Sequence, residues 1–264
     1  MRHNKSEWHP RVADSNIAHS PAVTALMFQK AAIPFPEGGI AVVFGAGGGI
    51  GRALVGQLQA GQNFKHVVGF SRASTPAIDL LIETTLKEAA DFATSQGEVR
   101  LALDATGFLH DDAHGPEKSW RELQPSHLAR SFALNAIGPA LIMKHVLLLL
   151  PRQGKAVFAT LSARLGSIGE NRLGGWYSYR ASKAALNQLV RTVAIELGRR
   201  RPNTICVALH PGTVDTGLTS PFKKTGLEVQ SPDAAAGRLL AVIDRLSPGD
   251  SGGFLDHRGE SVPW

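Results

Sequence analysis

The chain has 264 residues, of which 43% are apolar, and carries a formal net charge of +6. This length suits one α/β domain, and the apolar fraction excludes wholesale disorder because it supplies a sizeable core. The basic residues are scattered along the chain, so we expect neither a nucleic acid nor a membrane as partner. The single cysteine, Cys206, excludes an internal disulfide, and its apolar neighbours predict a buried thiol.

Residues 1–38 are polar, contain several His and Pro, and lack hydrophobic periodicity. We interpret them as an N-terminal extension, part of it disordered. The N-terminal segment has no apolar run typical of a signal peptide, and the most apolar stretch, residues 140–150, is too short to span a bilayer. We therefore expect a soluble, cytoplasmic protein.

From residue 40 onward, predicted strands and helices alternate. The strands are expected over residues 40–44, 66–70, 99–105, 156–161, 205–209 and 253–255, and the helices over 50–58, 82–93, 128–150, 181–200 and 232–246. The first strand is apolar throughout, as in a strand buried on both faces. The alternation predicts an α/β fold with a single Rossmann-type, doubly wound parallel sheet and helices on both faces.

The first strand runs directly into the glycine-rich segment Gly45-Ala46-Gly47-Gly48-Gly49-Ile50-Gly51, which a helix follows. Glycines permit a tight turn and a close approach to a phosphate, and a helix N-terminus offers free N–H groups to a pyrophosphate. A strand before the loop and a helix after it favour a dinucleotide site over a purely structural turn.

The second strand ends in Phe70-Ser71-Arg72, where an enzyme that uses NAD usually has an acidic residue for the ribose hydroxyls. A guanidinium beside a hydroxyl suits a 2′-phosphate instead. We therefore predict NADP(H) in preference to NAD(H), with Arg52 as a further contributor. The alternative is that Arg72 is only a solvated loop residue.

Tyr179 and Lys183 are four residues apart in a helical segment, so they share one face. A nearby cation favours the phenolate and lowers the pKa of a tyrosine, which then exchanges protons near pH 7. Tyr177 lacks such a partner, because its fourth neighbour is Ala181.

Together these motifs resemble the short-chain dehydrogenase/reductase superfamily, and the match continues in chain order. Asn135 resembles the helix asparagine of the family, and Ser162, at the end of a predicted strand, resembles its catalytic serine. Further similar segments are Asp79-Leu80, Asp104-Ala105-Thr106-Gly107 and Pro211-Gly212-Thr213-Val214-Asp215-Thr216. Residues 174–183 and the ending Val262-Pro263-Trp264 are most similar to the C-factor-like and sniffer-like carbonyl reductases.

The resemblance implies one domain over residues 39–264 that carries both the cofactor site and the substrate site. It also implies an NADP(H)-dependent oxidoreductase that transfers a hydride between the nicotinamide and a carbonyl or alcohol substrate. Tyr179 would be the general acid or base, Ser162 would bind the substrate oxygen, Lys183 would lower the tyrosine pKa and hold the nicotinamide ribose, and Asn135 would anchor a water linked to Lys183. The implied cofactor-binding residues are Gly45, Gly47, Gly49, Ile50, Gly51, Ser71, Arg72, Asp79, Leu80, Ala105, Thr106, Gly107, Tyr179, Lys183, Pro211, Gly212, Val214 and Thr216.

Three residues depart from the family pattern: Phe44 replaces Thr, Asp104 stands where Asn is common, and Thr106 replaces Ala. All three concern local hydrogen bonding or packing, so we expect cofactor affinity to suffer before the chemistry does. Ser167 competes with Ser162 for the serine role, but Ser162 directly ends a strand and is favoured. His110, His114 and His210 lack metal-ligand spacing, so we expect no metal.

Two segments of the sequence bear on the substrate site. An insertion at residues 164–175 is expected to form one wall of this site. Lys223 and Lys224 either favour an anionic substrate or are solvated. Relatives often form homodimers or homotetramers through the helices of Asn135 and Tyr179, and the apolar face with Leu189, Val193 and Leu197 serves that contact or the core. An NADPH-binding signalling protein of C-factor type is the alternative function.

Overall fold

The computed structural model describes residues 33–222, 226 and 228–264. Six strands form one sheet in the order β2-β1-β3-β4-β5-β8, and all neighbouring pairs are parallel. The strands are β1 (Ile40–Phe44), β2 (His66–Phe70), β3 (Val99–Asp104), β4 (Ala156–Leu161), β5 (Thr204–His210) and β8 (Phe254–Asp256). The expected Rossmann-type sheet is confirmed.

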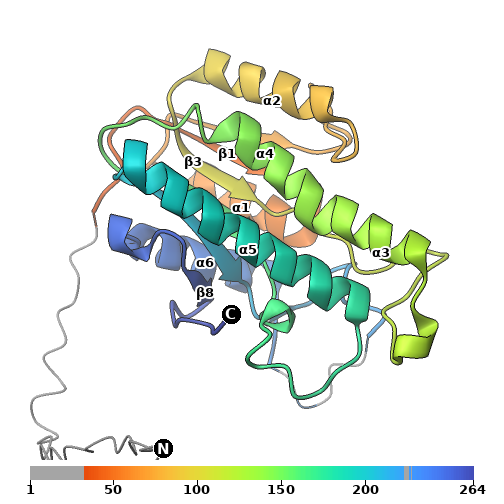
Figure 1. Ribbon diagram of the computed structural model, residues 1–264. Helices are drawn as coiled ribbons and strands as arrows, with labels where there is room; N and C mark the ends of the chain where they lie inside the picture. Colours follow the sequence, from red (N-terminus) through yellow and green to blue (C-terminus); the bar gives the residue numbers. More distant parts are fainter. Residues whose placement is uncertain (1–32, 223–225, 227) are drawn as a thin grey trace, which may run out of the picture. The chain divides into compact units, whose positions relative to one another are not determined.

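Helices cover both faces of this sheet (Figure 1). One face carries α1 (Gly49–Ala60) and α6 (Pro232–Arg245), whose apolar residues join the inward side chains of β1, β3, β4 and β5. The other face carries α2 (Glu83–Gln96), α4 (Gly138–Val146) and α5 (Tyr177–Arg200), which lie side by side in Figure 1. Strands β1, β3, β4 and β5 are buried on both sides, which explains their continuous apolar sequences.

The register brings the carboxyl ends of the central strands to one edge. Phe44 pairs with Asp104, Asp104 with Thr160, and Leu161 with Leu209. The loops that follow β1, β3, β4 and β5 therefore start beside one another. In sheets of this kind the ligand lies outside that edge.

The predicted helix over residues 128–150 is instead three consecutive pieces. α3 (Pro125–Phe132) leads into a π-helical turn at Ala133–Ile137, and α4 follows directly. Pro139 lies in the first turn of α4, where a missing N–H is tolerated. A π turn inside a helix is frequent at functional sites, and Asn135 lies within this one.

The helix expected from residue 181 begins four residues earlier, at Tyr177. Tyr179 therefore lies in its first turn. The paired glycines before it and the polar Ser178 and Arg180 concealed this start in the sequence. Leu189, Val193 and Leu197 pack against the core cluster of the α2, α4 and α5 face, so these side chains serve the core.

The remaining elements are short. Within the described residues they are a two-stranded sheet of β6 (Thr213–Val214) and β7 (Val229–Gln230), and 3-10 turns at Trp120–Glu122, Arg164–Gly166 and Pro248–Asp250. The extension expected at residues 1–32 and the pair Lys223 and Lys224 lie outside the described residues. Within the described ranges, no helix is long and apolar enough to cross a bilayer.

Candidate active site

The glycine-rich loop is packed so tightly that side chains are excluded at several positions. A Cβ at Gly45 would lie 2.8 Å from the carbonyl of Ala105, and one at Gly51 would lie 2.1 Å from the carbonyl oxygen of Gly45. Gly45 also has a φ of +83°, which favours glycine. The loop leads into the N-terminus of α1, whose first turn has no acidic side chain. Backbone N–H groups without a competing anion fit the pyrophosphate of a dinucleotide.

The end of β2 lies against this loop. A Cβ at Gly47 would be 3.4 Å from the Cβ of Ser71, and Ser71 accepts a hydrogen bond from Ala73 N, 3.1 Å away. Arg72 is exposed. Arg52 bends back from α1 to donate to the carbonyl of Gly47, 3.3 Å away. The Arg52 guanidinium therefore lies against the turn between β1 and α1, and Arg72 follows the residue of the β2 end that packs on this turn.

The other expected cofactor segments converge on the same edge. A Cβ at Gly49 would lie 2.8 Å from Cγ2 of Thr216, which brings the segment after β5 against the glycine loop. Gly212 has a φ of +81°, and Pro211 accepts from Gln230 Nε2 at 3.2 Å. A Cβ at Gly107 would be 3.9 Å from Lys183 Nζ. Val214 is buried in β6.

Asp79 and Leu80 lie before α2. Asp79 Oδ1 accepts from Leu81 N at 2.8 Å, which shapes the turn. A Cβ added to Gly138 would lie 2.8 Å from the Cβ of Leu80. The segment before α2 therefore packs closely on the start of α4. Thr106 donates from both N and Oγ1 to Asp104, at 3.0 and 2.6 Å.

Lys183 is buried, and its Nζ donates to the carbonyl of Leu161, the last residue of β4, at 2.8 Å. Burial lowers the pKa of Lys183 to about 8, and the carboxyl of Asp104 opposes that shift. Burial also raises the pKa of Tyr179 to about 12. The expected lowering of the tyrosine pKa is therefore not seen, because desolvation of the phenolate outweighs the cation.

Ser162 follows directly on β4 and is buried. Its Oγ donates to Oδ1 of Asn187 at 2.6 Å, and its N–H bonds the carbonyl of Leu209 at 2.8 Å. Ser167, the competing serine, is also buried, but its Oγ accepts from Glu170 N at 3.1 Å and shapes a turn. Ser162 is therefore tied to the face of α5 that carries Lys183, one helical turn away.

The side-chain amide of Asn135 makes three hydrogen bonds to other groups of the protein. Oδ1 accepts from Phe108 N at 2.7 Å, and Nδ2 donates to the Phe108 carbonyl at 2.8 Å and to Ser182 Oγ at 3.1 Å. These bonds fasten the loop after β3 to the π turn and to α5. The side-chain amide therefore acts as a brace, and the expected contact with a water remains a prediction.

Asp104 is completely buried at the end of β3. Burial raises its pKa, whereas Thr106, Thr160 and the charge of Lys183 oppose that rise. Thr160 Oγ1 donates to Asp104 Oδ2 at 2.7 Å. Asp104 thus accepts hydrogen bonds from Thr106 and Thr160 at this strand end, and its charge opposes the lowering of the Lys183 pKa.

The insertion at residues 164–175 is fastened to α5 by Arg180. Its guanidinium donates to the carbonyls of Leu165, Gly174 and Gly175 at 3.2, 3.2 and 3.0 Å. Ile168 and Leu173 are exposed on this segment. The insertion therefore lies beside the first turn of α5, and its role as a substrate wall remains a prediction.

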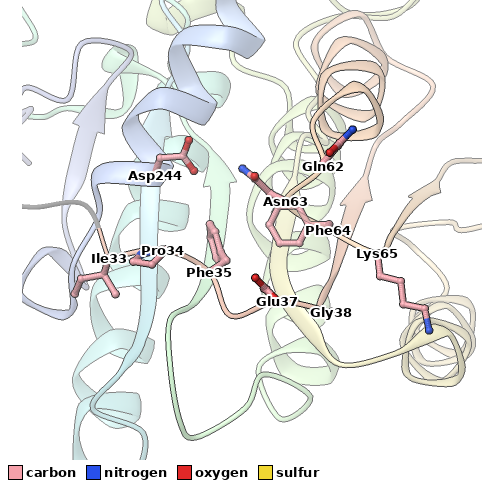
Figure 2. A pocket seen from close by; sticks show the side chains of 10 residues that line it. All are labelled: Ile33, Pro34, Phe35, Glu37, Gly38, Gln62, Asn63, Phe64, Lys65 and Asp244. Atoms are coloured by element: carbon pink, nitrogen blue, oxygen red, sulfur yellow. The ribbon is translucent and has the colours of Figure 1, made fainter.

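Among the described residues, neither a metal cluster nor the surface pocket before β2 competes with this edge as the active site. Within residues 33–222, 226 and 228–264, no three His, Cys, Asp or Glu side chains are arranged to hold a metal. A surface pocket of about 610 Å³ lies where residues 33–38 pass the start of β2, with Phe35 and Phe64 in ring contact at 5.1 Å (Figure 2). Apart from Asp244 in α6, its lining residues precede β1 and β2, so it lies at the edge opposite Ser162 and Lys183.

Comparison with known proteins agrees with this geometry. The family model described as enoyl-(acyl carrier protein) reductase matches residues 49–244. The chain belongs to the short-chain dehydrogenase/reductase family. Within this family, it is 39% identical over 137 residues to the C-signal of Myxococcus xanthus, covering 52% of this chain and 78% of that protein. It is 30% identical over 233 residues to 1-hydroxy-2-glutathionyl-2-methyl-3-butene dehydrogenase of Rhodococcus sp. (strain AD45), covering 84% of this chain and 98% of that protein.

Solved structures of the family share the fold. The carbonyl reductase Sniffer of D. melanogaster superimposes with a TM-score of 0.74 at 23% identity, covering 86% of this chain and all of that one. The NADPH-bound carbonyl reductase from chicken fatty liver gives a TM-score of 0.76 at 23% identity, and the match covers 89% of this chain and 97% of that one. The predicted family, including its likeness to C-factor and sniffer proteins, is confirmed.

The sequence alone missed several residues that this short-chain dehydrogenase/reductase places around Tyr179. Asn187 binds Ser162, Trp176 contacts the ring of Tyr179 edge-on at 6.2 Å, and Glu117 holds the start of α5. Asn187 was within reach, because it lies four residues after Lys183 and so on the same helix face. Glu117 is 61 residues from Ser178, and no local pattern predicts their contact.

Proposed function

We propose that the protein is an NADP(H)-dependent oxidoreductase that transfers a hydride between the nicotinamide and a carbonyl or alcohol substrate. The observation that carries the proposal is the hydrogen bond from Lys183 Nζ to Leu161, next to Ser162, at the edge that the glycine loop also reaches. A purely regulatory dinucleotide-binding protein has no need for a buried lysine and serine together with a partly exposed tyrosine on that edge.

The bound nicotinamide would supply the hydride, and the protein supplies position and a proton. A tyrosine with a pKa of about 12 is protonated at neutral pH, so Tyr179 is suited to donate a proton to the oxygen of a reduced carbonyl. Lys183, with a pKa of about 8, is mostly charged at pH 7 and stabilises the phenolate that remains. Ser162 holds the substrate oxygen.

The preference for NADP(H) rests on the exposed guanidinium of Arg72, the adjacent Ser71 and the nearby Arg52. Hydrogen bonds to charged groups contribute about 1.5–3 kcal/mol. Replacing Arg72 with Ala should therefore lower the ratio of kcat/KM for NADPH to that for NADH by tenfold or more, as measured by initial rates. A clear preference of the native protein for NADH would contradict the assignment.

The activity is tested by following NADPH absorbance with a panel of aldehydes and ketones. Tyr179→Phe should lower kcat about 10²–10⁴-fold, because it removes a positioned acid, while NADPH binding measured by fluorescence persists. Tyr177→Phe is the matched control in the same turn of α5 and should retain activity. Full activity of Tyr179→Phe would refute the assignment of the acid.

The alternative is an NADPH-binding signalling protein with little turnover, which the 39% identity to the C-signal of Myxococcus xanthus favours. NADPH binding without turnover across the panel would support it. We further propose a cytoplasmic homodimer or homotetramer; a monomer in light scattering would contradict the oligomer.

A further inference from the structure

Glu117 is a buried acidic residue in the long connection between β3 and α3, and only 3% of its surface is exposed. Its carboxylate faces the first turn of α5. Oε2 accepts from Ser178 N at 3.1 Å, and Oε1 accepts from the Ser178 hydroxyl. Ser178 is the second residue of α5, and the helix has no cap from its own Trp176 side chain. Glu117 therefore supplies the N-terminal cap from a distant loop.

The main chain of Glu117 makes a second contact. Trp176 N donates to the carbonyl of Glu117 at 2.5 Å, and the Trp176 carbonyl accepts from Arg180 N at 2.8 Å. Trp176 has φ 54° and ψ 43° and, among the described residues, is the one non-glycine residue with a positive φ. A left-handed conformation is costly for a bulky residue and persists only where its surroundings hold it. The hydrogen bond from Trp176 N to the Glu117 carbonyl is one of the contacts that stabilise this conformation.

The strained Trp176 lies against the proposed proton donor. Its ring contacts that of Tyr179 at 6.2 Å between centroids, and that of Phe222 at 5.2 Å. Phe222 in turn contacts the ring of His110, which is in the same connection as Glu117, at 5.3 Å. The connection after β3 thus reaches Tyr179 by two routes, through the helix cap and through the aromatic contacts.

The carboxylate is held in its ionised form. Burial alone would raise the pKa of Glu117, but the hydroxyl and N–H of Ser178 and the charge of His127 bring the pKa below its usual range. His127 Nδ1 lies 3.2 Å from Glu117 Oε1, and its ring stacks on that of His114 at 5.0 Å. An anion at a helix N-terminus is favoured by the helix dipole.

We propose that Glu117 is a positioning residue for Tyr179: its carboxylate fixes the first turn of α5 and thereby keeps its own main-chain carbonyl in place, which holds Trp176 in its left-handed conformation against the tyrosine ring. The inference rests on the proposed function of Tyr179 for its kinetic consequence, but not for its structural one. Misplacement of a reacting group by about 1 Å costs on the order of 10²-fold in rate. Glu117 therefore contributes to turnover without contacting substrate or cofactor.

The kinetic test uses Glu117→Gln, which keeps one acceptor oxygen and removes the charge. We expect kcat to fall about 10–100-fold, while the Kd for NADPH remains within twofold. Glu122→Gln is the matched control, because Glu122 accepts from Lys118 N at 2.8 Å in the same connection but is exposed. It should retain native kcat. A Glu117 that only stabilises the fold would lower Tm and leave kcat at 25 °C unchanged.

A double-mutant cycle with Ser178→Ala separates the cap from other roles of Glu117. Because the two side chains bond each other, the combined loss of kcat should be well below the product of the single losses. Multiplicative losses would overturn the proposed link. If Glu117→Gln does not fold, Ser178→Ala alone decides the question: a native kcat would refute the proposal.

A structural readout keeps the inference separate from the proposed activity. The chain has four tryptophans, and Trp176→Phe assigns the indole N–H resonance of Trp176. Glu117→Gln should shift or broaden this resonance and leave that of Trp264 unchanged. If the native protein reduces no carbonyl, the proposed function fails while this result still supports the role of Glu117. An unchanged Trp176 resonance in folded Glu117→Gln overturns the inference.

Discussion

Replacing Gly51 with alanine should break the glycine loop. The new Cβ would lie 2.1 Å from the carbonyl oxygen of Gly45, 2.8 Å from its carbonyl carbon and 3.1 Å from Cα of Ala46. All three atoms belong to the backbone, so no side chain can rotate away. Relief to an ordinary contact requires a displacement of about 1 Å. Overpacking of this kind costs about 1–3 kcal/mol of folding stability.

The same displacement moves the loop that would hold the pyrophosphate. We expect the Kd for NADPH, measured by fluorescence titration, to rise about 10–100-fold, since each tenfold step corresponds to about 1.4 kcal/mol of lost contact. Thermal unfolding should show a lowered Tm. Alanine is otherwise the better helix former by about 1 kcal/mol, which offsets part of the loss of stability.

Gly56 provides the matched control in the same helix. A Cβ there would meet open space, so Gly56→Ala should raise stability by about 0.5–1 kcal/mol and leave NADPH binding unchanged. If Gly51→Ala bound NADPH with native affinity and kept its Tm, the packing argument for the loop would be wrong.

The other predictions concern charge and capping. Asp104 raises the pKa of Lys183, so Asp104→Asn should lower that pKa below about 8 and move the alkaline fall of kcat/KM to lower pH; an unchanged pH profile would exclude the coupling. Ser231 Oγ accepts from Ala234 N at 3.1 Å as the N-cap of α6, so Ser231→Ala should cost about 1 kcal/mol in denaturant unfolding without changing kcat; an altered kcat would contradict a purely structural role.

The sequence predicted the strands well because four of them are buried on both faces and read as unbroken apolar runs. The glycine loop was equally visible, because close backbone packing at Gly45 and Gly51 admits no other residue. Both features are local: the residues that require them are contiguous in the chain.

The start of α5 was not predictable, because its cap comes from Glu117, across 61 residues. The prediction of a lowered pKa for Tyr179 was wrong for a related reason. A cation four residues away is visible in the sequence, whereas the depth at which the phenol is buried depends on the whole fold, and here burial raises the pKa to about 12.

Asp104 and Lys183 show how the site accommodates two buried charges. Each group alone is disfavoured in its charged form: burial raises the pKa of Asp104 and lowers that of Lys183, and each charge opposes the shift of the other. The sheet register places Asp104 beside Thr160, one residue before the carbonyl that holds Lys183 Nζ. A neutral residue at 104 would leave Lys183 without this compensation. The aspartate at a position where the family commonly has asparagine therefore favours a charged Lys183, which is the form that the proposed proton donation from Tyr179 requires.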